Sequence, residues 1–229
     1  MKAALGAVAI LAALGAVAIP QQASAAICTI GTVASYEALG GTGCSVGNLT
    51  FANFAYGSTF GGSGAAVLDT NVVVVPIPQL NNNGLLFSSG GWQAFGGAFV
   101  DSTLFFTVTA NKTVIEDATL AIAGGAVGTA FGNVGESILP LNLALFATTT
   151  SPFKHVTFAP TPQIEILKDI LVAAAANNPG PNFASITAVL QEFSTPGVPE
   201  LGTWAMMLIG FAGVGAQLRR RDRTITLTA

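Results

Sequence analysis

Arginine, histidine and charge of either sign are scarce in this 229-residue sequence. The four arginines all lie within residues 219–223, His155 is the single histidine, and charged residues make up only 8% of the chain. Residues 26–196 contain three lysines and nine acidic residues, so that region has a net charge of 3 − 9 = −6. Phosphate contacts need clustered lysine and arginine, so the composition excludes nucleic acid as a partner.

The same scarcity argues against catalysis and metal binding. A Ser-His-Asp arrangement would have to use His155, which lies in a predicted strand where a packing role is expected. Glu116 and Asp117 are adjacent, and neighbouring side chains of a strand point to opposite faces, so they do not form a carboxylate pair. Two cysteines and one histidine do not supply four zinc ligands. We therefore predict no enzyme activity, no metal and no cofactor.

The amino terminus has the organisation of a secretory signal peptide. Residues 1–25 contain one lysine, an apolar stretch from Ala3 to Ile19, and the sequence Ala23-Ser24-Ala25. Small residues in an A-x-A arrangement are typical of signal peptidase sites. Cleavage is expected after Ala25, which leaves Ala26 as the first residue of an exported chain.

Export determines how the two cysteines are interpreted. Cys28 and Cys44 are sixteen residues apart and lie in the region expected outside the cytoplasm. An oxidising compartment favours a disulfide between them, and closing a loop of this length stabilises the fold by ~3 kcal/mol.

The carboxyl terminus contains an apolar run followed by arginines. Residues 203–218 carry no formal charge and would span roughly 24 Å as a helix, slightly less than the ~30 Å hydrocarbon core of a membrane. Trp204 is expected at one interface and Arg219 at the other. The positive-inside rule then places residues 224–229 in the cytoplasm.

The order of these features resembles a known sorting signal. A Pro-Glu motif, a Trp-Ala pair, an apolar helix and an arginine cluster are similar to the PEP-CTERM signal in its P-E-P-x-x-W-A variant, which would occupy residues 197–223, with the motif at 198–205. The residues that carry the resemblance are Val198, Pro199, Glu200, Trp204, Ala205, Arg219, Arg220, Arg221 and Arg223. Leu201 stands where the second proline of the motif is usual.

The resemblance implies a route and a partner. Proteins with this signal are exported by Gram-negative bacteria that make extracellular polysaccharide, and exosortase, a transpeptidase-like membrane enzyme, processes them near the Pro-Glu motif. The chain is accordingly expected to be held in the inner membrane for a time and then to reach the cell surface or the extracellular matrix. An ordinary membrane anchor that is never cleaved is the alternative.

Residues 26–196 are predicted to form one all-β domain, a jelly-roll-like β-sandwich. Short alternating or β-branched runs are separated by Gly, Asn and Pro, which is typical of sandwiches. The expected strands are 49–56, 72–75, 85–88, 92–100, 103–109, 114–122, 142–149 and 153–158. Residues 164–176 also fit a helix, but a strand to about Val172 is preferred, and 184–193 alternate as a last strand.

Three functions fit this organisation. The sequence favours a non-enzymatic envelope or matrix protein that associates with exopolysaccharide in a biofilm. A carbohydrate-binding module that uses exposed aromatic residues such as Trp92 or Tyr56 is the alternative, and a hydrolase is the third. The sequence does not identify the ligand of the domain.

Overall fold

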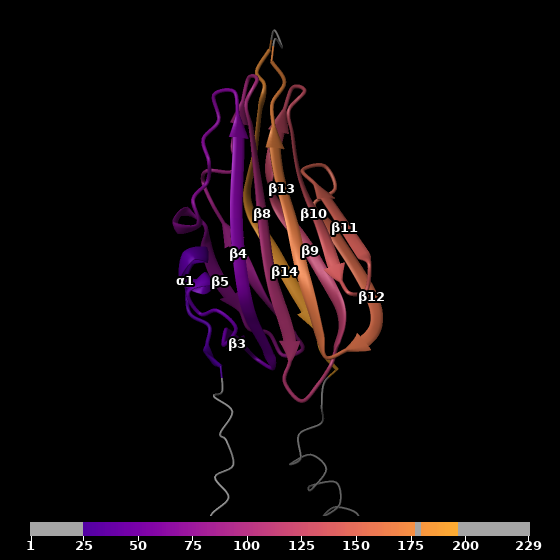
Figure 1. The fold of residues 1–229 in the computed structure, drawn as a ribbon. Coiled ribbons are helices and arrows are strands. Elements are labelled where there is room, and N and C mark those ends of the chain that lie inside the picture. Colours follow the sequence, from indigo (N-terminus) through magenta and orange to yellow (C-terminus); the bar gives the residue numbers. More distant parts are fainter. Residues whose placement is uncertain (1–24, 177–179, 197–229) are drawn as a thin grey trace, which may run out of the picture.

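A computed structural model describes residues 25–176 and 180–196, which fold into two β-sheets packed face to face (Figure 1). The predicted all-β sandwich is confirmed for this part of the chain. The predicted signal peptide up to Ser24, the predicted sorting helix and the arginine cluster lie outside the described residues.

Seven strands make up the first sheet in the described region, and all neighbours except β1 and β3 are antiparallel. In spatial order they are β1 (Ala26–Ile27), β3 (Cys44–Val46), β4 (Leu49–Gly61), β8 (Phe99–Ala110), β13 (Gln163–Ala173), β10 (Phe131–Leu139) and β11 (Leu143–Thr148). The central strand of this order is β8, and β13 pairs with it along the whole length of β13.

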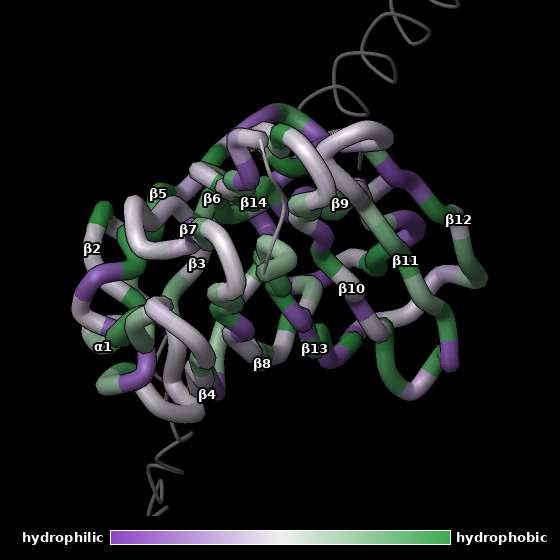
Figure 2. The backbone as a smooth tube through the Cα atoms, turned by 90° about the horizontal axis from the view of Figure 1, so that it is seen from above, coloured by the Kyte–Doolittle hydropathy of each residue, from purple (hydrophilic) through white to green (hydrophobic). Residues whose placement is uncertain are grey.

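The second sheet also has seven strands among the described residues. Its spatial order is β12 (Phe153–Thr161), β9 (Ile115–Val127), β14 (Phe183–Ser194), β6 (Asn82–Ser88), β5 (Val73–Ile77) and β2 (Gly31–Thr32), and β7 (Gln93–Phe95) pairs with the first residues of β14. Viewed from above, the two sheets form two layers (Figure 2).

Two short helical segments connect strands near one edge. Helix α1 (Val33–Glu37) begins with a capping box, in which Thr32 Oγ1 accepts from the Ser35 backbone N–H at 3.3 Å and Ser35 Oγ accepts from the Thr32 N–H at 3.0 Å. It buries Val33 and Tyr36. The 3₁₀ segment η1 (Asp69–Asn71) precedes β5. Neither segment is predicted by the sequence pattern.

Aromatic rings from both sheets fill the centre of the core. Phe106 on β8 stacks on Phe54 with 5.3 Å between ring centroids and also contacts Phe87 of the second sheet at 5.8 Å. Phe51 meets Phe106 and Phe193, each at 6.2 Å. Because these rings come from β4, β8, β6 and β14, they join the two layers through one apolar cluster.

Most predicted strands are present with different ends. The strands expected at 164–172 and 184–193 are confirmed as β13 and β14. A single strand over 92–100 is wrong, because a turn with Gly97 at φ +83° separates β7 from β8. Strand β4 continues past Tyr56 to Gly61, with a bulge where Asn53 has a positive φ of 55°.

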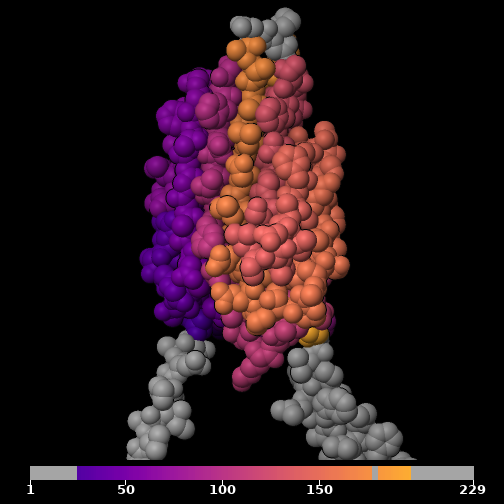
Figure 3. Space-filling view, turned by 45° about the vertical axis from the view of Figure 1, so that its right-hand side comes forward, coloured from indigo at the N-terminus to yellow at the C-terminus, as the bar shows by residue number. Residues whose placement is uncertain are grey.

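The molecule is elongated, and both ends of the described domain lie at the same pole (Figures 1 and 3). We call this end, with Ala26 and Ser194, the terminal pole. Hydrogen bonds secure the end of β14 there: Asn48 Nδ2 donates to Thr195 Oγ1 at 2.7 Å, and Gln79 Nε2 donates to Glu192 Oε1 at 2.8 Å. The opposite end, where β4 stops and β14 starts, is the distal pole.

Candidate functional site

The residues predicted for sorting and cleavage lie mostly outside the described part of the chain. Val198, Pro199, Glu200, Trp204, Ala205 and the four arginines belong to residues 197–229, and Ala23 belongs to residues 1–24. Ala25 and Ala26 are described. Ser45 Oγ donates to the carbonyl oxygens of Ala25 at 3.4 Å and Ala26 at 3.3 Å, so the expected new amino terminus lies against β3.

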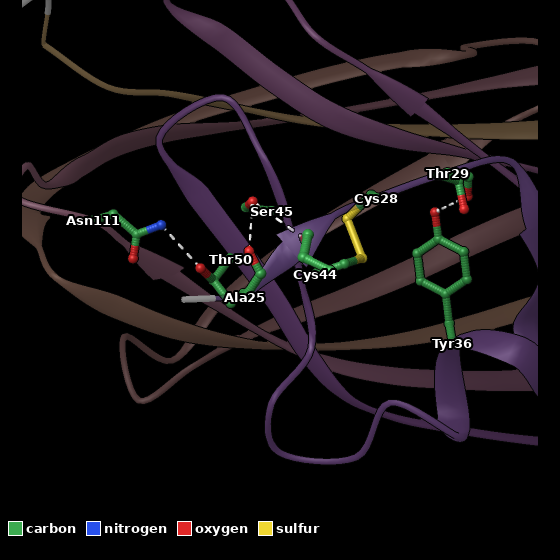
Figure 4. The surroundings of a disulfide bond; sticks show 9 residues. Ala25, Cys28, Thr29, Tyr36, Cys44, Ser45, Thr50 and Asn111 are labelled. Carbon is green, nitrogen blue, oxygen red and sulfur yellow. Dashed lines mark hydrogen bonds between the residues drawn. A yellow bond between two sulfur atoms is a disulfide. The ribbon is translucent and has the colours of Figure 1, made fainter. Parts of the chain in front are cut away.

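The predicted disulfide is confirmed (Figure 4). Cys28 and Cys44 are bonded, with their Cα atoms 4.8 Å apart, and both side chains are buried. The bridge fastens the first described residues to β3. Beside it, Tyr36 donates its hydroxyl hydrogen to the Thr29 carbonyl oxygen at 2.8 Å, and burial raises the pKa of Tyr36 to about 12.

The titratable residues considered for catalysis have structural partners instead. His155 on β12 lies opposite Thr119 on β9, and its Nδ1 is 2.9 Å from Thr119 Oγ1. Asp117 Oδ1 accepts from the Ser194 backbone N–H at 3.0 Å. His155 therefore contacts a neighbouring strand, whereas Asp117 binds the end of β14. The two residues do not form part of a nucleophile–base–acid arrangement.

A pocket of about 510 Å³ opens between two loops on the side of the second sheet, towards the distal pole. One loop follows β4 and the other joins β6 to β7. The lining consists of small, polar uncharged and apolar residues: Ser63, Gly64, Ala65, Ala66, Val67, Asn71, Ser89, Gly90, Gly91, Gln93, Phe95 and Ala98. The pocket therefore offers hydroxyl, amide and peptide groups without a titratable side chain.

A partly buried hydrogen-bond network supports both loops of this pocket. Trp92, between two lining residues, donates its indole N–H to Ser102 Oγ at 3.2 Å. Tyr56 also donates to Ser102 Oγ, at 3.0 Å, and Ser102 donates to Ser58 Oγ at 3.0 Å. Ser58 Oγ in turn accepts from the backbone N–H of Val67 at 3.2 Å. Ser102 on β8 thus connects the two loops through side chains.

Trp92 is not the exposed aromatic that the sequence suggested. It is 1% exposed, and Tyr56 is half-buried with its hydroxyl group in the same network. The expectation for Trp92 is wrong because β7 pairs with β14 and turns the indole into the core. Phe95 occupies the exposed position at the pocket: it is 54% exposed, and its ring centroid is 4.7 Å from that of Phe183.

Two carboxyl groups meet on the outer face of the first sheet, away from the pocket. Asp101 is on β8 and Asp169 is on the adjacent strand β13. Partial burial, and after it the neighbouring Asp101 carboxyl group, raise the pKa of Asp169 to about 6. The register of the sheet brings the two carboxyl groups together, and no local sequence pattern indicates the pair.

Neither a metal site nor a membrane-spanning helix is found among the described residues. Among residues 25–176 and 180–196, no group of three or more His, Cys, Asp or Glu side chains could hold a metal ion. No helix within the same ranges is long and apolar enough to cross a membrane. The apolar helix predicted for residues 203–218 falls outside them.

Comparison with known proteins gives little further information. No protein family matches the sequence, and no curated protein shows significant similarity to it. Among solved structures, one similar chain is a family 11 carbohydrate-binding module from Clostridium thermocellum, in complex with a β-1,3-1,4-mixed-linked tetrasaccharide. The two are 11% identical, the match covers 59% of this chain and 87% of the module, and the TM-score is 0.22. At this score the likeness carries no argument about the ligand.

Proposed function

We propose that this chain is an exported, non-enzymatic protein of the bacterial envelope or extracellular matrix, with a jelly-roll-like sandwich as its external domain. Its signal peptide is removed after Ala25, the segment 203–218 holds it in the inner membrane, and exosortase processes it near Pro199. The Cys28–Cys44 disulfide supports exposure to an oxidising compartment. Exopolysaccharide is the expected partner at its destination.

The observation that carries this proposal is that the two chain ends and the pocket lie towards opposite ends of the domain. Both ends of the described chain lie at the terminal pole, whereas the pocket lies towards the other end. Phe95, which lines the pocket, pairs with Phe183 at the start of β14. Phe183 lies eleven residues before Ser194, and eleven residues of strand span roughly 36 Å. The pocket and the terminal pole are separated by about that distance. A chain attached through its carboxyl terminus therefore presents the pocket away from the membrane.

The chemistry of the pocket supports binding over catalysis. General acid–base catalysis needs a group that can gain or lose a proton beside the substrate. Asn71, Gln93 and the lining serines cannot do this near neutral pH. They can donate and accept hydrogen bonds, so the pocket suits an uncharged ligand rich in hydroxyl groups.

Carbohydrate binding is the second candidate function, and the exposed aromatic residue favours it. Phe95 offers an apolar ring beside the free amide of Gln93, whose side chain has no hydrogen-bond partner among residues 25–176 and 180–196. The faces of a sugar ring present C–H groups and its edge presents hydroxyl groups. An aromatic ring next to amides matches both surfaces.

Retention on polysaccharide tests the binding role. Full-length protein in mild detergent is passed over the immobilised exopolysaccharide of the producing strain, and a glycan array is probed in parallel. The double change Gln93→Ala with Phe95→Ala should reduce retention at least tenfold. Phe146→Ala is a matched control, because Phe146 is 55% exposed on the first sheet. Equal loss in both variants would contradict a role for the pocket.

Localisation tests the sorting role separately. In the native host, the chain is followed by fractionation and by its size, with and without exosortase. Loss of exosortase should leave the unprocessed chain in the inner membrane. An unchanged size and an unchanged fraction would mean that residues 203–218 act as an uncleaved anchor.

A further inference from the structure

A lysine, a glutamate and a glutamine meet in the interior between the two sheets. Lys168 lies on β13, Glu136 is its cross-strand neighbour on β10, and Gln191 reaches across from β14 of the second sheet. The Lys168 Nζ atom donates hydrogen bonds to Glu136 Oε2 and to Gln191 Oε1. Lys168 and Gln191 are 0% exposed and Glu136 is 2% exposed.

Apolar side chains enclose this group. Each of the three residues has a buried leucine beside it on an adjacent strand: Leu104 next to Lys168, Leu145 next to Glu136, and Leu120 and Leu85 next to Gln191. A medium of this kind penalises charged forms, so burial lowers the pKa of Lys168 even though the Glu136 charge opposes the shift. An uncharged primary amine is a nucleophile.

The group is poorly explained as a stabilising ion pair. Within the described residues, Glu136 Oε1 and Gln191 Nε2 have no hydrogen-bond partner although both atoms are buried. A buried pair with unsatisfied atoms contributes less to stability than apolar residues of the same size. The arrangement instead brings an amine, a carboxyl group and a primary amide into mutual contact, shielded from water.

We propose that Lys168 and Gln191 become joined by an intramolecular isopeptide bond, with Glu136 as the group that carries the protons. The bond would covalently connect β13 and β14, which are the interior strands of opposite sheets. No external enzyme, oxidant or cofactor takes part.

The reaction is a transamidation and balances without another reactant. The Lys168 ammonium first gives a proton to Glu136 Oε2, which leaves a neutral amine and a carboxylic acid. The Nζ lone pair attacks Gln191 Cδ, and the C=O π electrons move to Oε1. Glu136 gives its proton to Nε2 and receives one from Nζ. The C–Nε2 bond then breaks, the carbonyl forms again, and ammonia leaves. The products are a secondary amide, ammonia and a neutral Glu136.

Peptide mapping of the full exported chain decides the question. Trypsin cleaves after Lys154 and, when its side chain is free, after Lys168; the next tryptic site is Arg219. With the bond in place, the peptide that starts at His155 continues through Gln191, and its mass is lower by about 17 Da, one ammonia. Fragment ions should place this loss on a bridge between the two residues. Two separate peptides with unchanged masses, one ending at Lys168 and the next beginning at Asp169, would overturn the proposal.

Variants separate the roles of the three residues. Lys168→Met and Gln191→Leu should abolish the mass loss, whereas Gln163→Leu, at an exposed position of β13, should retain it. Glu136→Gln keeps the amine and the amide but removes the proton carrier, so at least tenfold less bridged peptide is expected. Complete bridging in Glu136→Gln would refute its role. If a variant does not fold, the wild-type peptide map still decides the main claim.

Discussion

Replacing Ser102 with alanine removes one oxygen atom that three hydrogen bonds share. The Ser102 hydroxyl group accepts from the Trp92 indole N–H and from the Tyr56 hydroxyl group, and it donates to Ser58. Ser102 is 0% exposed and Trp92 is 1% exposed. Water therefore cannot easily replace the lost acceptor at the indole.

The size of the stability loss depends on which of the three partners can form another hydrogen bond after the change. Tyr56 and Ser58 are only partly buried, so water can solvate them after the change. The Trp92 N–H retains only the Tyr56 hydroxyl oxygen, at 3.4 Å. A buried donor without a good acceptor costs ~1 to 3 kcal/mol, so we expect the free energy of unfolding to fall by about 2 to 3 kcal/mol. For a domain of this size, this lowers the Tm by roughly 4 to 12 °C.

Unfolding by urea measures this loss, with Trp92 fluorescence as the signal. A Trp204→Phe background leaves Trp92 as the single tryptophan, because the sequence contains two. Ser137→Ala on β10 is the matched control: Ser137 is exposed, and its change should stay within ~0.5 kcal/mol. Ser102→Ala should also weaken retention on polysaccharide, since Ser58, which accepts from Val67 at the pocket, loses its hydrogen bond from Ser102. A loss no larger than that of the control would refute the shared-acceptor argument.

Three other perturbations test separate parts of the structure. The raised pKa of Asp169, about 6 against an ordinary 3.8, means that protonation favours the folded state; this stability is complete below pH 3.8 and is lost as the pH rises through 6. Asp169→Asn should therefore stabilise the domain at pH 7.5 but not at pH 3.5. The gain should be at most ~1 kcal/mol, because the group is exposed. Equal urea midpoints for the wild type and the variant at pH 7.5 would contradict this. Changing both Cys28 and Cys44 to serine should cost ~3 kcal/mol in the same assay, and a change below ~1 kcal/mol would argue against the loop-closure estimate. Replacing the four arginines of residues 219–223 with glutamine should let the unprocessed chain leave the membrane fraction, and wild-type fractionation would exclude a stop-transfer role.

Alternating sequence predicted the strands that have one face in the core. In β13, Ile164, Ile166 and Ile170 point inward and separate more polar positions, so the period of two is visible in the sequence. The disulfide was predictable because two cysteines allow only one pairing.

Strand β10 was not predicted, because its inward positions include Glu136. A carboxylate in a glycine-containing run normally indicates a surface loop, and only its partners on β13 and β14 explain its burial. The pocket was missed for a related reason. Its lining comes from Gly- and Ser-rich loops on either side of η1 and β6, and these loops meet only after the sheets have formed. The local sequence therefore does not predict that these loops lie side by side.

The place where the chain leaves the domain has a mechanical consequence. Strand β14 leads towards the proposed sorting segment, and it is held by β9 on one side and by β6 and β7 on the other. Ladder hydrogen bonds lie perpendicular to the strands, so tension between the carboxyl-terminal end and a ligand at the distal pole would load many of them together in shear. The same force applied sideways, at the edge strands β12 or β2, would peel them one at a time. A chain attached and loaded as we propose therefore bears the force in the direction in which its sheet best resists rupture.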